Sequence, residues 1–223
     1  MRTVLGEILP LAIVVTVSPI NIVASILLLF SRRAILNASC YLAGFVVGVA
    51  AVIAVLTAIA GAVHLSTDGQ RSRVVSGLLL LLGIWLLVQA VHKFRSRPAE
   101  GDAVETPAWM EGITGFGPGK SLGIGLTVGA ANPKNIAVAL ASAVVIATAG
   151  LGTGQAIAVI VVYTVVASLG VAAPIVAILV LGDRGDEVVT GWQTWLERNT
   201  AAMMAVIYLV FGVILIGKGF AGT

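Results

Sequence analysis

Near the middle of the chain lies Ala130-Ala131-Asn132-Pro133-Lys134-Asn135-Ile136, a polar, proline-containing interruption of an apolar segment that runs from about Leu122 to Ala149. An ionisable side chain near the centre of a bilayer costs roughly 2.5 to 3.5 kcal/mol even on lenient insertion scales. Charged residues that persist inside membrane spans therefore usually serve function. We expect Lys134 to be such a residue.

The chain carries a second copy of this pattern near its start, Ser18-Pro19-Ile20-Asn21-Ile22. A constant offset of 114 residues aligns Pro19 with Pro133, and the same offset aligns Asn21 with Asn135. Proline lacks an N–H and clashes with the preceding helical turn, so each copy predicts a broken helix whose freed backbone oxygens need partners. The candidate partners are the side chains of Ser18, Asn21, Asn132, Lys134 and Asn135.

The composition is that of an integral membrane protein. Of the 223 residues, 59% are hydrophobic and 10% are charged, with a mean hydropathy of +1.08. Soluble domains carry about 25% charged residues. The net charge of +3 does not indicate nucleic-acid binding, because the basic residues lie at the ends of apolar runs and not in one patch. The single cysteine, Cys40, excludes a disulfide framework.

Six apolar runs are long enough to cross about 30 Å of hydrocarbon as helices. Lipid offers no partners to backbone groups, so each span has to satisfy its own backbone and the expected fold is all-α. The glycine pairs Gly44/Gly48 and Gly125/Gly129 predict close helix packing, because each pair lies on one helix face. The spans are expected at about 4–30, 38–63, 74–92, 121–148, 154–181 and 200–217.

The proline-broken first and fourth spans occupy corresponding places in the two halves of the chain. Three spans per half is an odd number, so the halves are expected to be inverted repeats. We predict one three-helix repeat at residues 1–94, a cytoplasmic linker with an interfacial segment at 95–120, and the second repeat at 121–223. Broken helices at corresponding positions are typical of a transporter site near the bilayer midplane. The residues expected to line it are Ser18, Pro19, Asn21, Asn132, Pro133, Lys134 and Asn135.

Basic residues are divided unequally between the two sides of this topology. The side that holds both termini receives four, and the opposite side receives eight. The positive-inside rule therefore places both termini outside the cytoplasm. Trp109 in the linker, and Trp192 and Trp195 before the last span, are expected to anchor at the membrane interface on the more basic side.

Several classes of function lack the residues that they need. The run from Gly115 to Ser121 resembles a phosphate-binding loop, but it is one residue too short and no strand precedes it. His64 and His92 lie at opposite ends of spans, so no metal site is expected. No grouping of nucleophile, base and oxyanion donors is visible, so we expect neither an enzyme nor a cofactor. The charge of Lys134 favours an anionic or zwitterionic ligand over a cation.

Four motifs carry a family resemblance: Val17-Ser18-Pro19, Tyr41-Leu42-Ala43-Gly44-Phe45, Pro107-Ala108-Trp109-Met110 and Asn132-Pro133-Lys134-Asn135. They are similar to the GAP family, the peptidoglycolipid- and sulfolipid-addressing proteins of the LysE transporter superfamily. The resemblance covers nearly the whole chain. It implies a six-span bacterial inner-membrane protein of inverted design, associated with export of cell-envelope glycolipids. Related exporters often have an acidic residue where this chain has Ser18, so Lys134 has no obvious counter-ion.

The resulting hypothesis is a membrane exporter that moves or addresses an anionic cell-envelope glycolipid, with one three-span half rocking against the other. One alternative is an exporter of small solutes such as amino acids, and another is a non-transporting accessory of a lipid-export machine. The expected partners are a lipid or small anionic substrate, the membrane, and a second copy of the chain or the envelope lipid-export machinery.

Overall fold

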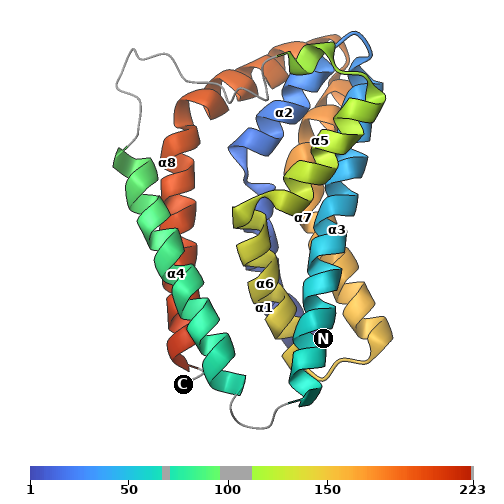
Figure 1. Cartoon of the computed structure of the whole chain (residues 1–223). Helices are drawn as coiled ribbons and strands as arrows, with labels where there is room; N and C mark the ends of the chain where they lie inside the picture. The colour runs from blue at the N-terminus through green and yellow to red at the C-terminus, as the bar shows by residue number, and fades with distance from the viewer. Residues whose placement is uncertain (67–70, 96–111, 222–223) are drawn as a thin grey trace.

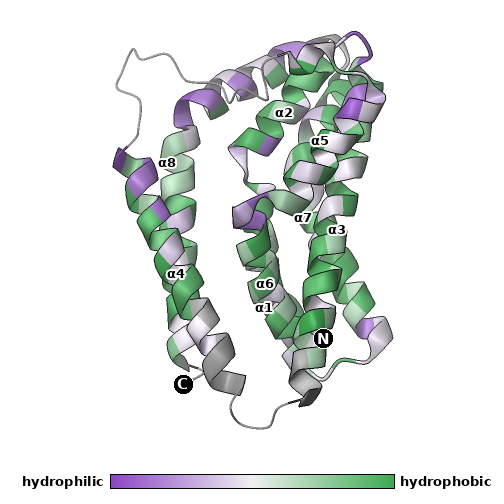
Figure 2. Ribbon diagram, viewed as in Figure 1, coloured by the Kyte–Doolittle hydropathy of each residue, from purple (hydrophilic) through white to green (hydrophobic). Residues whose placement is uncertain are grey.

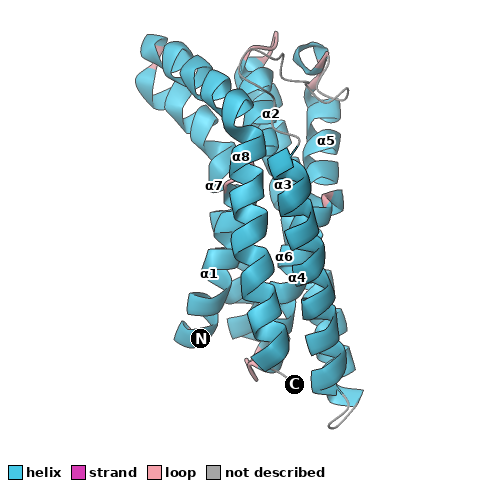
Figure 3. Ribbon diagram, turned by 90° about the vertical axis from the view of Figure 1, so that its left-hand side faces the viewer, coloured by secondary structure: helices cyan, strands magenta, loops and turns pink. Residues whose placement is uncertain are grey.

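The structure, a computed structural model, describes residues 1–66, 71–95 and 112–221. Within these residues every regular element is a helix and none is a strand (Figure 3). The all-α prediction is confirmed for this part of the chain. Most of the predicted linker, including Trp109, lies outside the described residues, whereas residues 112–116 of its interfacial segment are described.

The first half of the chain forms α1 (Arg2–Thr16), α2 (Pro19–Leu29), α3 (Ala34–Ser66) and α4 (Arg71–Arg95). The chain bends by 51° between α1 and α2. Pro19 is the first residue of α2, where its missing N–H costs no hydrogen bond. The expected first span is therefore a broken one, as the proline predicts.

The second half repeats this order after a short 3₁₀ helix, η2 (Ile113–Gly115). It forms α5 (Pro118–Ala131), α6 (Pro133–Thr148), α7 (Thr153–Leu181) and α8 (Asp183–Ala221). The bend between α5 and α6 is 56°, and Pro133 is the first residue of α6. The predicted break in the fourth span is present at the predicted residue.

Length and composition allow three of the described helices, α3, α7 and α8, to cross a membrane, and up to five spans result if each bent pair counts as one. The predicted third span coincides with α4, whose 25 residues extend over about 37 Å. Hydrophobic residues cover the middle of the helices, whereas hydrophilic ones gather at one end of the molecule and at the start of α6 (Figure 2).

The last helix begins earlier than the span expected at 200–217. α8 has 39 residues, and its first part runs across one end of the molecule before the helix turns down beside α4 (Figure 1). In that first part Val189 and Leu196 are buried while Trp192 and Trp195 are exposed. A search for apolar runs misses such an amphipathic segment, because only one of its faces is apolar.

Glycines bring α3 and α5 into backbone contact, as the spacing predicts. A Cβ atom added at Gly44, Gly48, Gly125 or Gly129 would collide with the backbone of the other helix. At Gly48 it would lie 2.6 Å from the carbonyl oxygen of Leu126. α3 belongs to the first half of the sequence and α5 to the second, so this contact joins the two halves.

Two further helix pairs join the halves in the same way. α1 packs on α7, where a Cβ at Gly170 would collide with the carbonyl of Thr16. α4 packs along α8, where a Cβ at Gly83 would lie 2.9 Å from the carbonyl oxygen of Gly212. Figure 1 shows the α4–α8 pair beside the remaining helices, with both termini at the same end of the molecule.

Candidate functional site

The break between α1 and α2 releases a backbone carbonyl. In an uninterrupted helix the N–H of Ser18 would bond to the carbonyl of Val14, four residues earlier. Ser18 instead adopts an extended conformation with φ −106° and ψ 101°, and α2 starts at the next residue. The carbonyl oxygen of Val14 accepts a hydrogen bond from Nζ of Lys134, at 2.9 Å.

The break between α5 and α6 releases the corresponding carbonyl. In an uninterrupted helix the N–H of Asn132 would bond to the carbonyl of Val128. α5 ends at Ala131, and Asn132 is extended, with φ −72° and ψ 118°. The carbonyl oxygen of Val128 accepts a hydrogen bond from Nδ2 of Asn135, at 3.2 Å. Val128 lies 114 residues after Val14, the offset that also relates the two prolines. Both released carbonyls are thus taken by side chains that follow Pro133.

Lys134 is buried, with 2% of its surface exposed. Its side chain does not extend to the membrane interface but turns to the C-terminal turn of α1, which carries the negative end of that helix dipole. The ammonium group is therefore placed against a partial negative charge. The structure thus gives the ammonium group a backbone partner at the first break, where the sequence has Ser18 and no acidic side chain.

Asn132 has a structural role that its partner at the first break does not share. Its Oδ1 accepts the backbone N–H of Lys134 at 3.0 Å, which caps the N-terminus of α6. Ser18 occupies the same position before α2, but its side chain makes no capping bond. The two breaks are therefore alike in backbone and different in side chains.

The two aligned asparagines also differ in their partners. Asn135 uses its Nδ2 on Val128, and its buried Oδ1 meets no partner among the described residues. Asn21 is completely buried, and within the described part of the chain neither its Nδ2 nor its Oδ1 is hydrogen-bonded. The hydroxyl of Tyr41 donates to the backbone carbonyl of Asn21 at 3.4 Å, so it leaves the amide side chain untouched.

A cavity of about 410 Å³ lies between α2 and α5, next to both breaks. Its wall includes Asn21, Thr127, Asn132 and Pro133, together with apolar side chains of α2 and α5. Lys134 is not part of the described lining. The breaks thus bring four polar or proline residues to one cavity, while the ammonium group of Lys134 bonds to α1.

Hydroxyl groups fix the broken first span against α7. Oγ of Ser25 donates to the carbonyl of Val171 at 2.9 Å. Oγ1 of Thr16 donates to the carbonyl of Val166. Sequence reasoning did not find these contacts, or the role of Val14, because a backbone carbonyl has no residue type that marks it.

Six of the seven predicted residues fall into three groups, and the seventh, Ser18, is buried at the first break without making a capping bond. Pro19 and Pro133 start helices, and Asn132 caps one of them. Lys134 and Asn135 bond released carbonyls, and Asn21 and Asn132 line the cavity. In the described part of the chain, no three His, Cys, Asp or Glu side chains are placed to hold a metal ion.

The family model described as Sap, sulfolipid-1-addressing protein, matches residues 8–221. The matched range includes both helix breaks and all seven predicted site residues. No curated protein and no solved structure matches the chain.

Proposed function

Because the chain belongs to the family of Sap, the sulfolipid-1-addressing protein, we propose that it is a membrane exporter that moves or addresses an anionic cell-envelope glycolipid across the bacterial inner membrane. The family description supports a lipid as the cargo. The apolar helices support a position within a membrane. The two helix breaks, with a buried lysine between them, support a transport site.

The proposed architecture has six spans in two inverted repeats. Three features support it: the bends of 51° and 56° at corresponding prolines, the released carbonyls of Val14 and Val128 at the same offset, and the termini at one end of the molecule (Figure 1). The excess of basic residues on the other end supports a cytoplasmic position for that end, with both termini outside the cytoplasm.

The observation that carries the proposal is the hydrogen bond from Lys134 to the carbonyl of Val14. A carbonyl offers the ammonium group only a partial charge, whereas a sulfate, phosphate or carboxylate offers a full one. An anionic headgroup that reaches Lys134 would therefore compete for it. Once the lysine leaves Val14, the bond that ties α6 to α1 is lost, and movement about the two breaks can alternate access to the site.

The mostly apolar wall of the cavity favours a lipid over a small zwitterion, which would need more polar partners. The small-solute exporter and the accessory subunit remain the alternatives that the experiment has to separate. The accessory role requires a larger lipid-export machine as partner. The exporter we propose acts as a single chain or as a homodimer.

The test is lipid analysis of inner-membrane and cell-surface fractions from cells that carry the wild-type protein, no protein, or the Lys134→Met variant. Lys120→Met is the matched control, because Lys120 is exposed and lies over the ring of Phe116, away from the breaks. We expect one anionic glycolipid to accumulate in the inner membrane without the protein and with Lys134→Met, but not with Lys120→Met. Normal surface delivery by Lys134→Met at wild-type membrane levels would contradict the proposal.

A second arm separates the alternatives. Purified protein in liposomes is expected to move the accumulated lipid between leaflets without other proteins. An accessory subunit would move nothing alone, although its deletion would still cause the lipid to accumulate. A small-solute exporter would leave all lipid fractions unchanged.

A further inference from the structure

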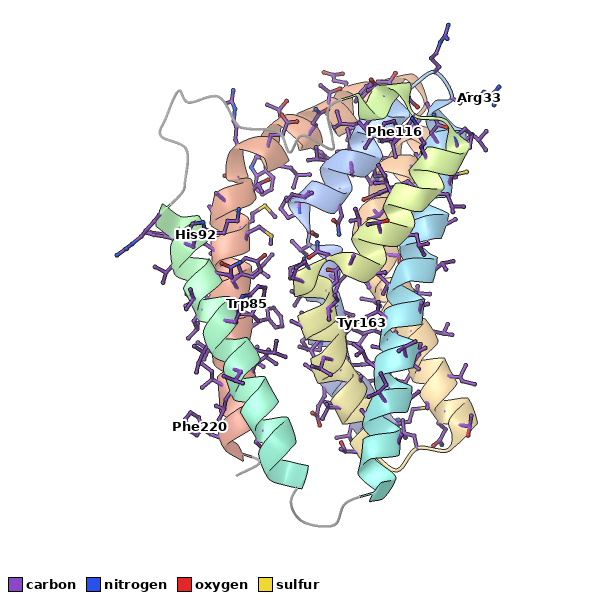
Figure 4. The ribbon with its side chains drawn as sticks, viewed as in Figure 1. Arg33, Trp85, His92, Phe116, Tyr163 and Phe220 are labelled. Carbon is purple, nitrogen blue, oxygen red and sulfur yellow. The ribbon has the colours of Figure 1, made fainter. Side chains whose placement is uncertain are left out.

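A second cavity, of about 210 Å³, lies at the end of the molecule opposite the termini, where Figure 4 labels Arg33 and Phe116. Arg32, Arg33 and Asn37 form one side of its wall, and residues 114–118, just before and at the start of α5, form the other. We propose that this cavity binds the headgroup of an anionic phospholipid of the surrounding leaflet, through the phosphate and a neighbouring hydroxyl. The site is separate from the cavity at the helix breaks, because the two have no described lining residue in common.

Two helices begin at this second cavity. Gly44 of α3 faces Leu122 of α5, and Gly48, one turn later, faces Leu126. α3 and α5 therefore run parallel and start at the same end of the molecule. Neither helix has an acidic residue in its first turn, and Gly117 gives α5 no side-chain cap. The positive ends of two helix dipoles, with N–H groups that have no partner within their own helix, thus favour an anion here.

The side chains around the cavity add positive charge. Arg32 and Arg33 are exposed, and both line the cavity. None of the described lining residues is acidic. A guanidinium group donates paired hydrogen bonds to phosphate oxygens in a geometry that a single ammonium group cannot match. The two arginines therefore favour a phosphate group as the anion.

The side chain of Asn37 adds a requirement that a simple phosphate does not meet. Asn37 is 1% exposed, and its Nδ2 donates to Oγ of Ser31 at 2.8 Å and to the carbonyl of Phe116 at 2.9 Å. Because that carbonyl can only accept, the orientation of the amide is fixed. Its buried Oδ1 has no partner among the described residues. Buried polar atoms are almost always hydrogen-bonded, so this acceptor beside a cavity indicates a ligand that carries a hydrogen-bond donor.

The surroundings favour a lipid over a soluble phosphate compound. Leu36 and Leu122, near the starts of α3 and α5, are exposed and can contact acyl chains. The cavity is also smaller than the roughly 300 to 1,000 Å³ of sites that enclose a whole drug-sized ligand, so it suits a headgroup better than a nucleotide. The donor for Oδ1 of Asn37 is a hydroxyl and not an ammonium group, because the arginines and the helix starts favour a ligand with net negative charge.

The experiment measures lipid binding to the purified full-length protein in phosphatidylcholine nanodiscs. The probes are phosphatidylglycerol and phosphatidylmethanol with the same acyl chains. Both are singly charged phosphodiesters, and only phosphatidylglycerol has hydroxyls in its headgroup. We expect phosphatidylglycerol to bind roughly 3- to 10-fold more tightly, the effect of one hydrogen bond. In Asn37→Leu the ratio of the two affinities should fall below about twofold, whatever the substitution does to each affinity alone.

The arginines are tested as a pair. Arg32→Gln combined with Arg33→Gln should weaken binding of both lipids roughly 10- to 30-fold, since each basic residue near a membrane surface contributes a factor of about five. The matched control is Arg184→Gln combined with Arg198→Gln, which removes the same charge from exposed positions in the first half of α8. It should change both affinities less than about twofold. A large excess of glycerol phosphate, which is the same headgroup without acyl chains, should not displace phosphatidylglycerol.

Four results would overturn the proposal. They are a wild-type affinity ratio below about twofold, a ratio that persists in Asn37→Leu, equal effects of the two arginine pairs, and failure of the wild-type protein to bind either lipid. Displacement by glycerol phosphate would overturn it as well, and would assign the cavity to a free phosphate compound. None of these outcomes bears on the proposed export, because the site does not include the helix breaks.

Discussion

The ammonium nitrogen of Lys134 lies 2.9 Å from the carbonyl oxygen of Val14, a residue 120 positions earlier in the chain. The bond joins the first turn of α6 to the last turn of α1 across two helix breaks. Hydrogen bonds to charged groups contribute about 1.5 to 3 kcal/mol when they are buried. We therefore expect the position of Lys134 to affect stability, to affect access to the proposed site, and to limit which partners Asn21 can have.

We predict that Asn21→Leu stabilises the wild-type protein but destabilises the Lys134→Met variant. In the wild-type protein the substitution removes a buried amide that has no partner among the described residues, so the free energy of unfolding should rise by about 1 kcal/mol. In a Lys134→Met background the Val14 carbonyl is open, and Asn21 can bond to it as Asn135 bonds to Val128. There Asn21→Leu should lower the free energy of unfolding by about 1 kcal/mol.

Reversible unfolding of the four proteins of this cycle in detergent gives the measurement. Equal effects of Asn21→Leu in both backgrounds would show that Lys134 and Asn21 do not compete for the carbonyl of Val14.

Alanine should have different effects on stability at two glycines of α5. At Gly125 a Cβ would collide with the backbone of Tyr41, so we expect a loss of about 1 to 3 kcal/mol in the free energy of unfolding. At Gly123 a Cβ would meet no atom within 4 Å. Gly123→Ala should therefore be neutral, or stabilising by up to about 1 kcal/mol through helix propensity. Melting temperatures in detergent distinguish the two, and equal values would contradict the packing of α3 on α5.

Asn132→Ala should destabilise the start of α6 by about 1 kcal/mol, because it removes the capping bond to the N–H of Lys134. Asn132→Ser, which can still cap, should retain most of that stability. The aligned Ser18→Ala is the control: the side chain of Ser18 makes no capping bond, so its loss should change the melting temperature less than that of Asn132 does. An equal or larger effect at Ser18 would mean that capping does not distinguish the two breaks.

The tryptophans are expected at different depths in the bilayer. Trp192 and Trp195 lie in the part of α8 that crosses one end of the molecule, whereas Trp85 lies midway along α4 (Figure 4). Variants that keep one of these tryptophans can be placed in bilayers with brominated lipids. Bromine near the headgroups should quench Trp192 and Trp195 most strongly, and bromine deep in the acyl chains should quench Trp85. Similar depth profiles for all three would contradict the interfacial position of early α8.

The orientation can be measured with cysteine labelling in a Cys40→Ser background. Arg33 is exposed at the end of the molecule opposite the termini, and Thr3 is exposed near the N-terminus (Figure 4). If both termini face away from the cytoplasm, a membrane-impermeant maleimide should label Thr3→Cys in intact spheroplasts, and Arg33→Cys only after lysis. The reverse pattern would place the termini in the cytoplasm.

The sequence predicted the long helices well, because lipid requires apolar runs of nearly fixed length. The breaks at Pro19 and Pro133 were also predictable, since proline cannot continue the backbone ladder. The family resemblance is confirmed by the match to residues 8–221, whereas membership of the LysE superfamily stays a prediction. The early start of α8 was missed because its first part is amphipathic.

The partners of the site residues were harder to predict than their positions. The polar side chains were expected to bond the oxygens that the breaks release, and Lys134 and Asn135 do so. The carbonyl to which each side chain bonds depends on how α6 packs against the other helices. Such tertiary packing is not visible in a pattern of residue types along the chain. The amide of Asn21 has no partner among the described residues, whereas its alignment with Asn135 alone would have suggested that the two asparagines have equal roles.

The glycine contacts restrict which parts of the protein can move independently. α3 cannot separate from α5, α1 from α7, or α4 from α8 without opening a backbone-to-backbone contact, and each pair contains one helix from either half of the sequence. If the protein transports as proposed, we expect these mixed pairs to move as units, in place of the expected rocking of one sequence half against the other. Two halves expressed as separate chains would therefore each lack these contacts until they assemble with one another.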